Sequence, residues 1–447
     1  MQTLIDTAYA YRKWISLKLR AARGTGNGPS PARHLALFAW SLPPSTWAGV
    51  YRPLSFLEYS PRARWRVTAF GGEATDQDRI GGDELLARVP PSSTILPLAP
   101  TARAPSWSLF PRTNGGFLDA VEYAHAAIDY LRIDPPSAVL ASGPTFEMFI
   151  AAAFVAPYFR VPLILDYRDE WTECPFSFVR LGKDDRKWER RCLARADKVL
   201  FTTRSQLQHH LLTFPELTAD KALLLPNGWD PVEFDADAAV PATRDAGSPL
   251  RIALVGNLAD HASPDRFLRS FGRLLAEHAE WREQVVVDFI GRKSPEAKAM
   301  LDTFPFPANV RAIAHMSKTQ AVRAMQQADA LLLIALPELE RYLPGKLFDY
   351  LAAKRPVLVH GAPGEASRAV EELGAGFLCE DGNDERLLEI LGRLRAGTAQ
   401  PQSDRTERWL EEHRRDVLAG RLYALLDELQ ERSRKRTGSF TAFSGRA

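Results

Sequence analysis

Cysteine is scarce in this 447-residue chain, and its three cysteines, Cys174, Cys192 and Cys379, lie far apart in the sequence. Because no C-x-x-C pair occurs, the sequence does not indicate a structural zinc site. A sparse, odd number of cysteines does not form a disulfide framework and fits a reducing compartment. The nine histidines form no H-x-x-x-H or H-E-x-x-H pattern, so they predict no metal centre.

Long apolar runs and an excess of one charge are also lacking. The most apolar stretch, 148–159, is closed by Arg160 and is shorter than the roughly 20 residues that a membrane-spanning helix needs. The N-terminus carries Asp6 and no apolar segment before a small-residue cleavage site, so we expect no signal peptide and a cytoplasmic protein. The net charge is +2, from 57 basic and 55 acidic residues. This balance argues against a nucleic-acid partner, because such binding needs a strong positive field.

Short apolar runs alternate with helical patterns over most of the chain. The composition, 45% hydrophobic and 25% charged, is that of a globular protein. Strands are predicted at 34–40, 65–70, 93–98, 138–142, 161–166, 198–203 and 222–226, and then at 250–255, 285–290, 310–312, 330–335, 355–359 and 376–379. Continuous apolar strands with helices between them indicate parallel sheets that are covered on both faces.

The alternation has one interruption, at 235–248, where large apolar residues are few. We therefore expect two Rossmann-like domains, at 25–229 and 235–402. A basic amphipathic helix is predicted before them at 1–24, and a closing helical segment at 403–434 precedes a tail at 435–447 that we expect to be disordered. In the first helix, apolar residues recur at helical spacing among basic ones: Leu4, Ala8, Tyr11, Ile15 and Leu19 among Arg12, Lys13, Lys18, Arg20 and Arg23.

The loops that follow the predicted strands carry small and charged residues. Ligands of open α/β sheets bind at such loops, so two domains of this kind predict a cleft between the carboxyl ends of two sheets. In the first domain the loops contain Gly49 and Tyr51, then Ser142-Gly143-Pro144, then Asp166-Tyr167-Arg168-Asp169-Glu170-Trp171, and last Asn227-Gly228-Trp229-Asp230. In the second they contain Gly256-Asn257, Gly291-Arg292-Lys293 and Pro344-Gly345-Lys346-Leu347-Phe348-Asp349-Tyr350-Leu351, which leads to Pro356-Val357-Leu358.

Taken in this order, the segments resemble GT-B-fold glycosyltransferases of the family 4 type, over roughly residues 33–430. Those enzymes move a sugar from a nucleotide-sugar donor with retention of the anomeric configuration. The run from Pro344 to Leu358 is the most specific element of the resemblance. It implies two Rossmann-like domains with doubly wound parallel sheets that face a central cleft, and a C-terminal helix that crosses back to the first domain.

The helix after Pro344 and Gly345 is predicted to bind the donor. Its first N–H groups and the positive end of its dipole suit a diphosphate, Gly345 permits close approach, and Lys346 adds positive charge. The resemblance implies that Asp349, one turn further on, accepts hydrogen bonds from ribose hydroxyls. The alternative interpretation is a core helix on which Lys346 and Asp349 face solvent.

Other donor contacts are predicted nearby. The resemblance places Gly256 and Asn257 against the donor, with Arg292 in place of a cation pair that many relatives carry. His315 is a candidate for the nucleobase pocket. Many relatives also carry an acid eight residues before the Asp349 position, where this chain has Arg341.

The acceptor side is predicted at Gly49, Tyr51, Gly143 and Asp166. Relatives often carry a histidine near the position of Arg168, and arginine cannot act as a base. We therefore expect a front-face reaction in which the departing diphosphate takes the acceptor proton, with Asp169, Arg168 and Lys346 as the catalytic set. Neither a metal nor a cofactor is implied, and the nucleotide-sugar is a substrate. The alternative for the loop 166–169 is a buried ion-pair network.

The sequence thus predicts a retaining glycosyltransferase that acts on a glycan or lipid-linked acceptor in surface polysaccharide biosynthesis. Two alternatives stay open: a UDP-sugar 2-epimerase of the same fold, and a non-catalytic module that binds a sugar or a partner. The basic first helix and the basic stretches 180–198 and 432–436 fit either solvated helix faces or peripheral contact with an anionic membrane, at the inner face of the plasma membrane.

Overall fold

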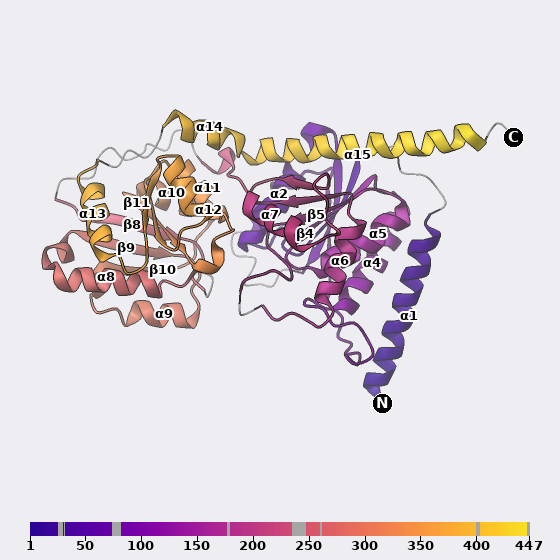
Figure 1. Cartoon of the computed structure of the whole chain (residues 1–447), viewed down its shortest axis with the longest axis horizontal. Helices are drawn as coiled ribbons and strands as arrows, with labels where there is room; N and C mark the ends of the chain where they lie inside the picture. Colours follow the sequence, from indigo (N-terminus) through magenta and orange to yellow (C-terminus); the bar gives the residue numbers. More distant parts are fainter. Residues whose placement is uncertain are drawn as a thin grey trace. The chain divides into compact units, whose positions relative to one another are not determined.

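The chain folds into two units, each built around one parallel sheet (Figure 1). The computed structural model describes residues 1–25, 30, 32–73, 82–176, 179–234, 247–259, 262–398 and 403–444, without the side chains of 434–444. Unit 1 comprises Met1–Pro226 and Leu418–Ala447, and unit 2 comprises Asn227–Val417. The first predicted helix therefore belongs to unit 1, and the closing segment is shared between the two units.

Unit 1 has a seven-stranded parallel sheet in the order β3-β2-β1-β4-β5-β6-β7. Its strands are β1 (His34–Ala39), β2 (Arg66–Gly72), β3 (Thr94–Leu98), β4 (Ala138–Gly143), β5 (Leu163–Tyr167), β6 (Lys198–Phe201) and β7 (Ala222–Leu224). All seven were predicted from their apolar runs. The strand order reverses between β1 and β4, so the loops after these two strands border the usual ligand site of a doubly wound sheet.

The helices of unit 1 cover both faces of this sheet. They are α1 (Gln2–Arg23), α2 (Tyr51–Glu58), α3 (Gly82–Leu86), α4 (Phe117–Leu131), α5 (Glu147–Phe159), α6 (Asp185–Arg195), α7 (Arg204–Thr213) and most of α15 (Arg415–Ser444). On one face, α5 packs between the sheet and α4, α6 and α1.

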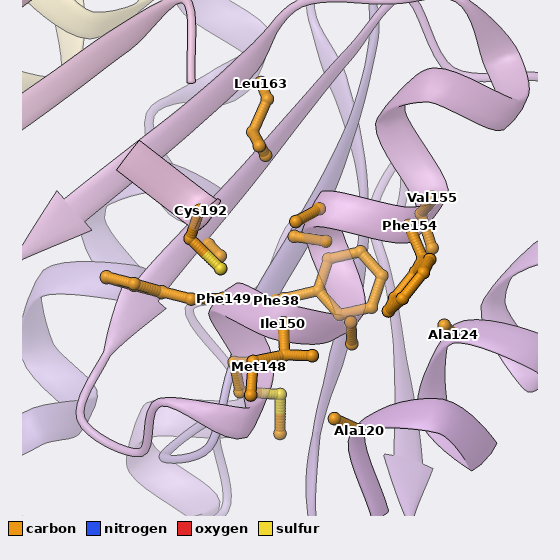
Figure 2. Packing of buried hydrophobic residues seen from close by; sticks show 14 of the residues in the cluster. Phe38, Ala120, Ala124, Met148, Phe149, Ile150, Phe154, Val155, Leu163 and Cys192 are labelled. Atoms are coloured by element: carbon orange, nitrogen blue, oxygen red, sulfur yellow. The ribbon is translucent and has the colours of Figure 1, made fainter. Parts of the chain in front are cut away.

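The most apolar stretch of the sequence is α5, which is buried on all sides from Glu147 to Ala156. Figure 2 shows Phe149 and Ile150 of this helix among Phe38 of β1, Cys192 of α6 and Ala120 of α4. A helix that is apolar all round is a core helix when it is this short. No helix among the described residues is both long and apolar enough to cross a membrane.

The C-terminal helix α15 crosses back to unit 1, as predicted. Leu422 and Leu426 join a core with Leu35 of β1, and the Tyr423 hydroxyl donates a hydrogen bond to the Phe56 carbonyl of α2. The helix continues to Ser444, so the tail predicted to be disordered from 435 is helical up to that residue; 445–447 lie outside the described residues. This stretch contains no proline, and a single glycine costs a helix only about 1 kcal/mol.

Unit 2 repeats the winding with six parallel strands in the order β10-β9-β8-β11-β12-β13. The strands are β8 (Leu250–Val255), β9 (Val285–Ile290), β10 (Val310–Ile313), β11 (Ala330–Ala335), β12 (Val357–Gly361) and β13 (Gly376–Cys379). The helices are α8 (Asp265–Glu277), α9 (Pro295–Asp302), α10 (Lys318–Gln327), α11 (Gly345–Ala352), α12 (Glu365–Glu372), α13 (Asp384–Arg395) and α14 (Asp404–Glu412). Here the order reverses between β8 and β11, so the loop after β8 and the segment that leads to α11 border the corresponding ligand site.

Candidate active site

In unit 2, the start of α11 meets the loop that follows β8. Pro344 is the N-cap of α11, with an extended backbone, and Lys346 is the second residue of the helix. The Lys346 side chain reaches Gly256, where an added β-carbon would lie 3.1 Å from its Nζ. Gly256 has a φ of 144°, a conformation that favours glycine. Two segments predicted to bind the donor are thus in contact, although 90 residues separate them in the sequence.

The Lys346 ammonium group is desolvated and has no acidic partner among the described residues. The side chain is half-buried, and no hydrogen bond or ion pair joins its Nζ to any described residue. Burial lowers the pKa of Lys346 to about 8, and no neighbouring acid raises it. A bound anion would restore the lost stabilisation of this charge.

The space around this cation is bounded by backbone on one side and open on another. An added β-carbon on Gly291, the residue after β9, would lie 2.2 Å from the Gly256 carbonyl oxygen, so this loop must lack a side chain to pack there. At Gly345, by contrast, an added β-carbon would meet no described atom within 4 Å. The first turn of α11 is therefore accessible beside Gly345.

Asp349 lies one turn further along α11 and is buried, with only 9% of its surface exposed. Its Oδ2 accepts a hydrogen bond from Lys318 Nζ at 2.5 Å, whereas its Oδ1 is buried without a partner among the described residues. Lys318 also pairs with Glu233 at 3.2 Å, and Glu233 pairs with Arg415 at 2.9 Å. Asp349 therefore does not face solvent, and one of its carboxylate oxygens is free to accept a hydrogen bond.

Sequence analysis did not identify Lys318, Glu233 or Arg415 as neighbours of Asp349. These residues come from the start of α10, from the segment before β8 and from the start of α15. No local spacing relates them, because the tertiary fold brings them together.

The remaining predicted donor residues lie near the same sheet edge. Arg292 follows β9 and His315 follows β10; burial lowers the pKa of His315, and the charge of Arg292 lowers it further. Asn257 is half-buried in the loop after β8. No group of three or more His, Cys, Asp or Glu side chains that could hold a metal ion occurs in the described ranges.

In unit 1, Arg168 joins the loops that follow β1 and β4. Its guanidinium donates hydrogen bonds to the backbone carbonyls of Gly143 at 3.0 Å, Pro144 at 2.7 Å and Gly49. An added β-carbon on Gly49 would lie 2.7 Å from this guanidinium. A close approach at Gly49 is therefore made by Arg168. These bonds use all three of its side-chain nitrogens within unit 1.

Asp166 is fully buried and bonded within unit 1. It accepts hydrogen bonds from Arg52 at 2.7 and 2.9 Å and from the Ser142 hydroxyl at 2.7 Å. Arg52 in turn donates to the carbonyls of Leu225 and Pro226. The buried ion pair, which was the alternative interpretation of this loop, therefore describes Asp166 better than contact with an acceptor does. Arg52 was missed as its partner because 114 residues separate the two.

Asp169 differs from its neighbours in the same loop. It is half-buried, and no hydrogen bond to its carboxylate occurs within the part of the chain that the structure describes. Burial raises the pKa of Asp169, the nearby Arg168 charge opposes that rise, and Glu170 adds to it. Tyr51, the remaining predicted acceptor residue, is half-buried at the start of α2. Asp169 therefore keeps a carboxylate that can bind a ligand hydroxyl.

Comparison with known proteins places this geometry in a known fold. The family model described as "Glycosyl transferases group 1" matches residues 249–396, which is most of unit 2. No curated protein sequence matches the chain. The structure is similar to sucrose-phosphate synthase from Thermosynechococcus elongatus, with 14% identity, a TM-score of 0.67, and coverage of 89% of this chain and 99% of that one.

Two further solved structures show the same fold. Anabaena HepE, solved with UDP and glucose, has 11% identity and a TM-score of 0.63 and covers 89% of this chain and 100% of its own. WaaG, a glycosyltransferase involved in lipopolysaccharide biosynthesis, has 14% identity and a TM-score of 0.55 and covers 89% of this chain and 98% of its own. Similarity at these identities establishes the GT-B fold, which agrees with the two observed sheets.

Proposed function

We propose that this protein is a glycosyltransferase of the GT-B fold, and that it is a retaining enzyme that uses a nucleotide-diphospho-sugar. The match of residues 249–396 to the model of the glycosyl transferases group 1 supports the proposal. The acceptor we propose is a glycan or a lipid-linked sugar in surface polysaccharide biosynthesis. HepE, solved with UDP and glucose, and WaaG, involved in lipopolysaccharide biosynthesis, are consistent with that choice.

The observation that carries the proposal is the unpartnered Lys346 ammonium group at the start of α11. A diphosphate bound there would meet this cation, the free N–H groups of the first helical turn and the backbone of Gly256. The desolvation that lowers the pKa of Lys346 would be offset by the negative charge of such a ligand. Asp349 supports a nucleotide at this place, because its unpartnered Oδ1 can accept a hydrogen bond from a ribose hydroxyl.

Lys346 would also contribute to the transfer of the sugar. In the proposed reaction, the bond between the anomeric carbon and the diphosphate oxygen breaks, and a bond from the acceptor oxygen to that carbon forms on the same face. The acceptor proton passes to the departing diphosphate, so the products are a glycosylated acceptor and a nucleoside diphosphate. Lys346 would stabilise the charge that develops on the leaving oxygen.

On unit 1, Asp169 is the group we assign to the acceptor. Its carboxylate is half-buried and not hydrogen-bonded within the described residues, so it can accept a hydrogen bond from an acceptor hydroxyl and orient it. Arg168 would act through its neighbours, because its three bonds to backbone carbonyls fix the loops beside Asp169.

A panel of nucleotide-sugars tests the proposal directly. The full chain is incubated with UDP-, GDP-, ADP- and dTDP-sugars, with and without a mixture of glycan acceptors, and the release of nucleoside diphosphate is measured together with the sugar products. We expect release from one class of donor, and faster release when an acceptor is present. The configuration at the anomeric carbon of the product, determined by NMR, distinguishes retention from inversion.

Each alternative gives a different result in the same assay. A donor sugar epimerised at C2 without transfer to an acceptor would identify a 2-epimerase. Binding of a nucleotide or sugar with no turnover across the panel would identify a non-catalytic module. Either result, or an inverted product, would contradict the proposed function.

A further inference from the structure

The first helix, α1, uses one of its faces to pack on unit 1. Ala10 and Leu17 are fully buried, and α1 packs on α4 and α5. Trp14 contacts the rings of Phe117 and Phe110 edge-to-face, with centroid distances of 5.1 and 5.8 Å. This face is therefore part of the hydrophobic core of unit 1.

The opposite face of α1 is mostly apolar, and no described residue of unit 1 covers it. Positions 1, 4, 8, 12, 15 and 19 follow one another at three or four residues and so share this outer face. Leu4, Ile15 and Leu19 are 66%, 51% and 52% exposed, and Met1 and Ile5 are exposed beside them. Figure 1 draws α1 along the outside of α4 and α5, which it contacts with its inner face. An exposed apolar stripe of this length usually marks a binding surface.

The charges around the outer face are positive. The single acid of α1, Asp6, is buried and paired with Arg103 at 3.1 Å. The acids of α4 that reach α1 are also neutralised, because Glu122 pairs with Lys13 and Asp129 pairs with Arg20.

Three cations remain for an external partner. Arg12, Lys18 and Arg23 are exposed, and none of them forms an ion pair within the described parts of the chain. The Lys18 ammonium lies 3.7 Å from the centre of the Trp14 ring, at the border between the inner and outer faces. The outer face therefore carries apolar residues on both sides of Arg12, with Lys18 and Arg23 at its edges.

We propose that this outer face of α1 docks onto an anionic lipid membrane. Apolar residues along one face with Lys and Arg around them are typical of helices that lie in the plane of the membrane interface. A second copy of this chain is the less suitable occupant, because pairing two such faces would bring their unneutralised cations together. The proposal does not rest on sugar transfer, since α1 contributes no residue to the candidate active site.

Vesicle binding by the full chain tests the proposal. Flotation is measured with phosphatidylcholine vesicles that contain phosphatidylglycerol and with vesicles of phosphatidylcholine alone. We expect binding to the anionic vesicles that weakens as salt is added. The triple variant Leu4→Asp/Ile15→Asp/Leu19→Asp should bind at least tenfold more weakly, because it places three charges on the apolar stripe.

A matched control separates this surface from apolar exposure in general. Leu212 of α7 is 89% exposed in the same unit, and Leu212→Asp should bind vesicles as the wild type does. The charge variant Arg12→Gln/Lys18→Gln/Arg23→Gln should lose about tenfold or more on anionic vesicles and show little salt dependence. Unchanged melting temperature and nucleotide binding in each variant show that the fold is intact.

Three outcomes would overturn the proposal. The first is a wild type that does not bind vesicles of either composition, and the second is a triple Asp variant that binds as tightly as the wild type. A wild-type dimer without vesicle affinity, which the triple Asp variant converts to a monomer, would identify a second copy as the occupant.

Discussion

The two sheets have the same winding, yet a prominent charged group at the carboxyl end of each is bonded differently. Arg168 is hydrogen-bonded within unit 1, whereas Lys346 of unit 2 is bonded to no described residue. In unit 1, Asp166 and Arg52 neutralise each other, and the bonds of Arg168 are taken up by backbone carbonyls. In unit 2, Lys346 lies at the equivalent reversal of strand order with no partner among the described residues. Charges that are bonded internally hold loops in place, whereas a desolvated and unbonded charge is poised for a ligand. The comparison separates residues whose bonds fix the loops of their own unit from residues whose charge is available to a ligand.

The largest expected effect is on the stability of unit 1. Arg52→Met leaves the fully buried Asp166 without its cation, which should lower the free energy of unfolding by about 3–5 kcal/mol. Urea unfolding monitored by circular dichroism measures this loss. The control Arg190→Met removes an exposed ion pair with Glu216 and should cost less than about 1 kcal/mol. Equal effects of the two variants would show that the pair does not stabilise this sheet edge.

In unit 2, replacement of Lys346 should lower the rate of sugar transfer without lowering the free energy of unfolding. Lys346→Gln should lower kcat/KM for the donor by about a hundred- to a thousandfold, or about 3–4 kcal/mol, because it removes a cation from the leaving group. The free energy of unfolding should not fall, since the charge that is lost has no partner. Donor kinetics and urea unfolding measure the two quantities. Lys298→Gln, on an exposed face of α9, is the control, and a wild-type rate for Lys346→Gln would contradict the assignment.

Each unit also contains a buried histidine whose pKa lies well below its usual value. Burial lowers the pKa of His34 in unit 1 and of His360 in unit 2 from 6.5 to about 4. The unfolded chain therefore binds a proton first, so stability is fully present above about pH 6.5 and is lost as the pH falls toward 4. The shift of 6.5 − 4 = 2.5 units corresponds to at most about 3.4 kcal/mol for each histidine. Hydrogen exchange between pH 7 and pH 4 would measure this loss in each unit.

Replacement of each histidine in turn should have different effects on the stability of the two units. His34 shares a hydrogen bond of 2.9 Å with Thr68, whereas both ring nitrogens of His360 are buried without a partner among the described residues. His34→Phe should therefore destabilise unit 1 by about 1 kcal/mol at pH 7, and His360→Phe should be neutral or stabilising. Each variant should reduce the loss of stability of its own unit between pH 6.5 and pH 4. An unchanged pH profile of unit 2 in His360→Phe would exclude His360 as its source.

On ligand binding, a smaller effect than that of Lys346→Gln is expected at Asp349. Asp349→Ala should weaken nucleotide affinity by about 1–3 kcal/mol if its unpartnered oxygen receives ribose hydroxyls. Isothermal titration with the nucleoside diphosphate measures this change. Asp302→Ala, on an exposed turn of the same unit, should leave affinity unchanged. Wild-type affinity in a folded Asp349→Ala protein would restrict Asp349 to its ion pair with Lys318.

Much of the fold could be predicted because its signals are local. Every strand is an apolar run bounded by turn residues, and the predicted bounds of β8, β9, β11 and β13 coincide with those observed. The helix α2 was not predicted; the fold buries most of its side chains in unit 1. In α1 the spacing placed Tyr11 on one face with Leu4, Ala8, Ile15 and Leu19, but Tyr11 packs inward against Phe110. Leu4, Ile15 and Leu19 face outward, because Ala10, Trp14 and Leu17 fill the inner side.

The sequence alone determined the alternation of strands and helices and the segment around Lys346, because periodic burial and helix capping act over a few neighbouring residues. Only the tertiary structure decided which charged side chains are hydrogen-bonded or ion-paired within the protein. Asp166 meets Arg52, Arg168 meets Gly49, and Asp349 meets Lys318 because strand order brings distant loops to one sheet edge. Whether a charged side chain is bonded or free depends on those long-range neighbours, and no local pattern encodes them.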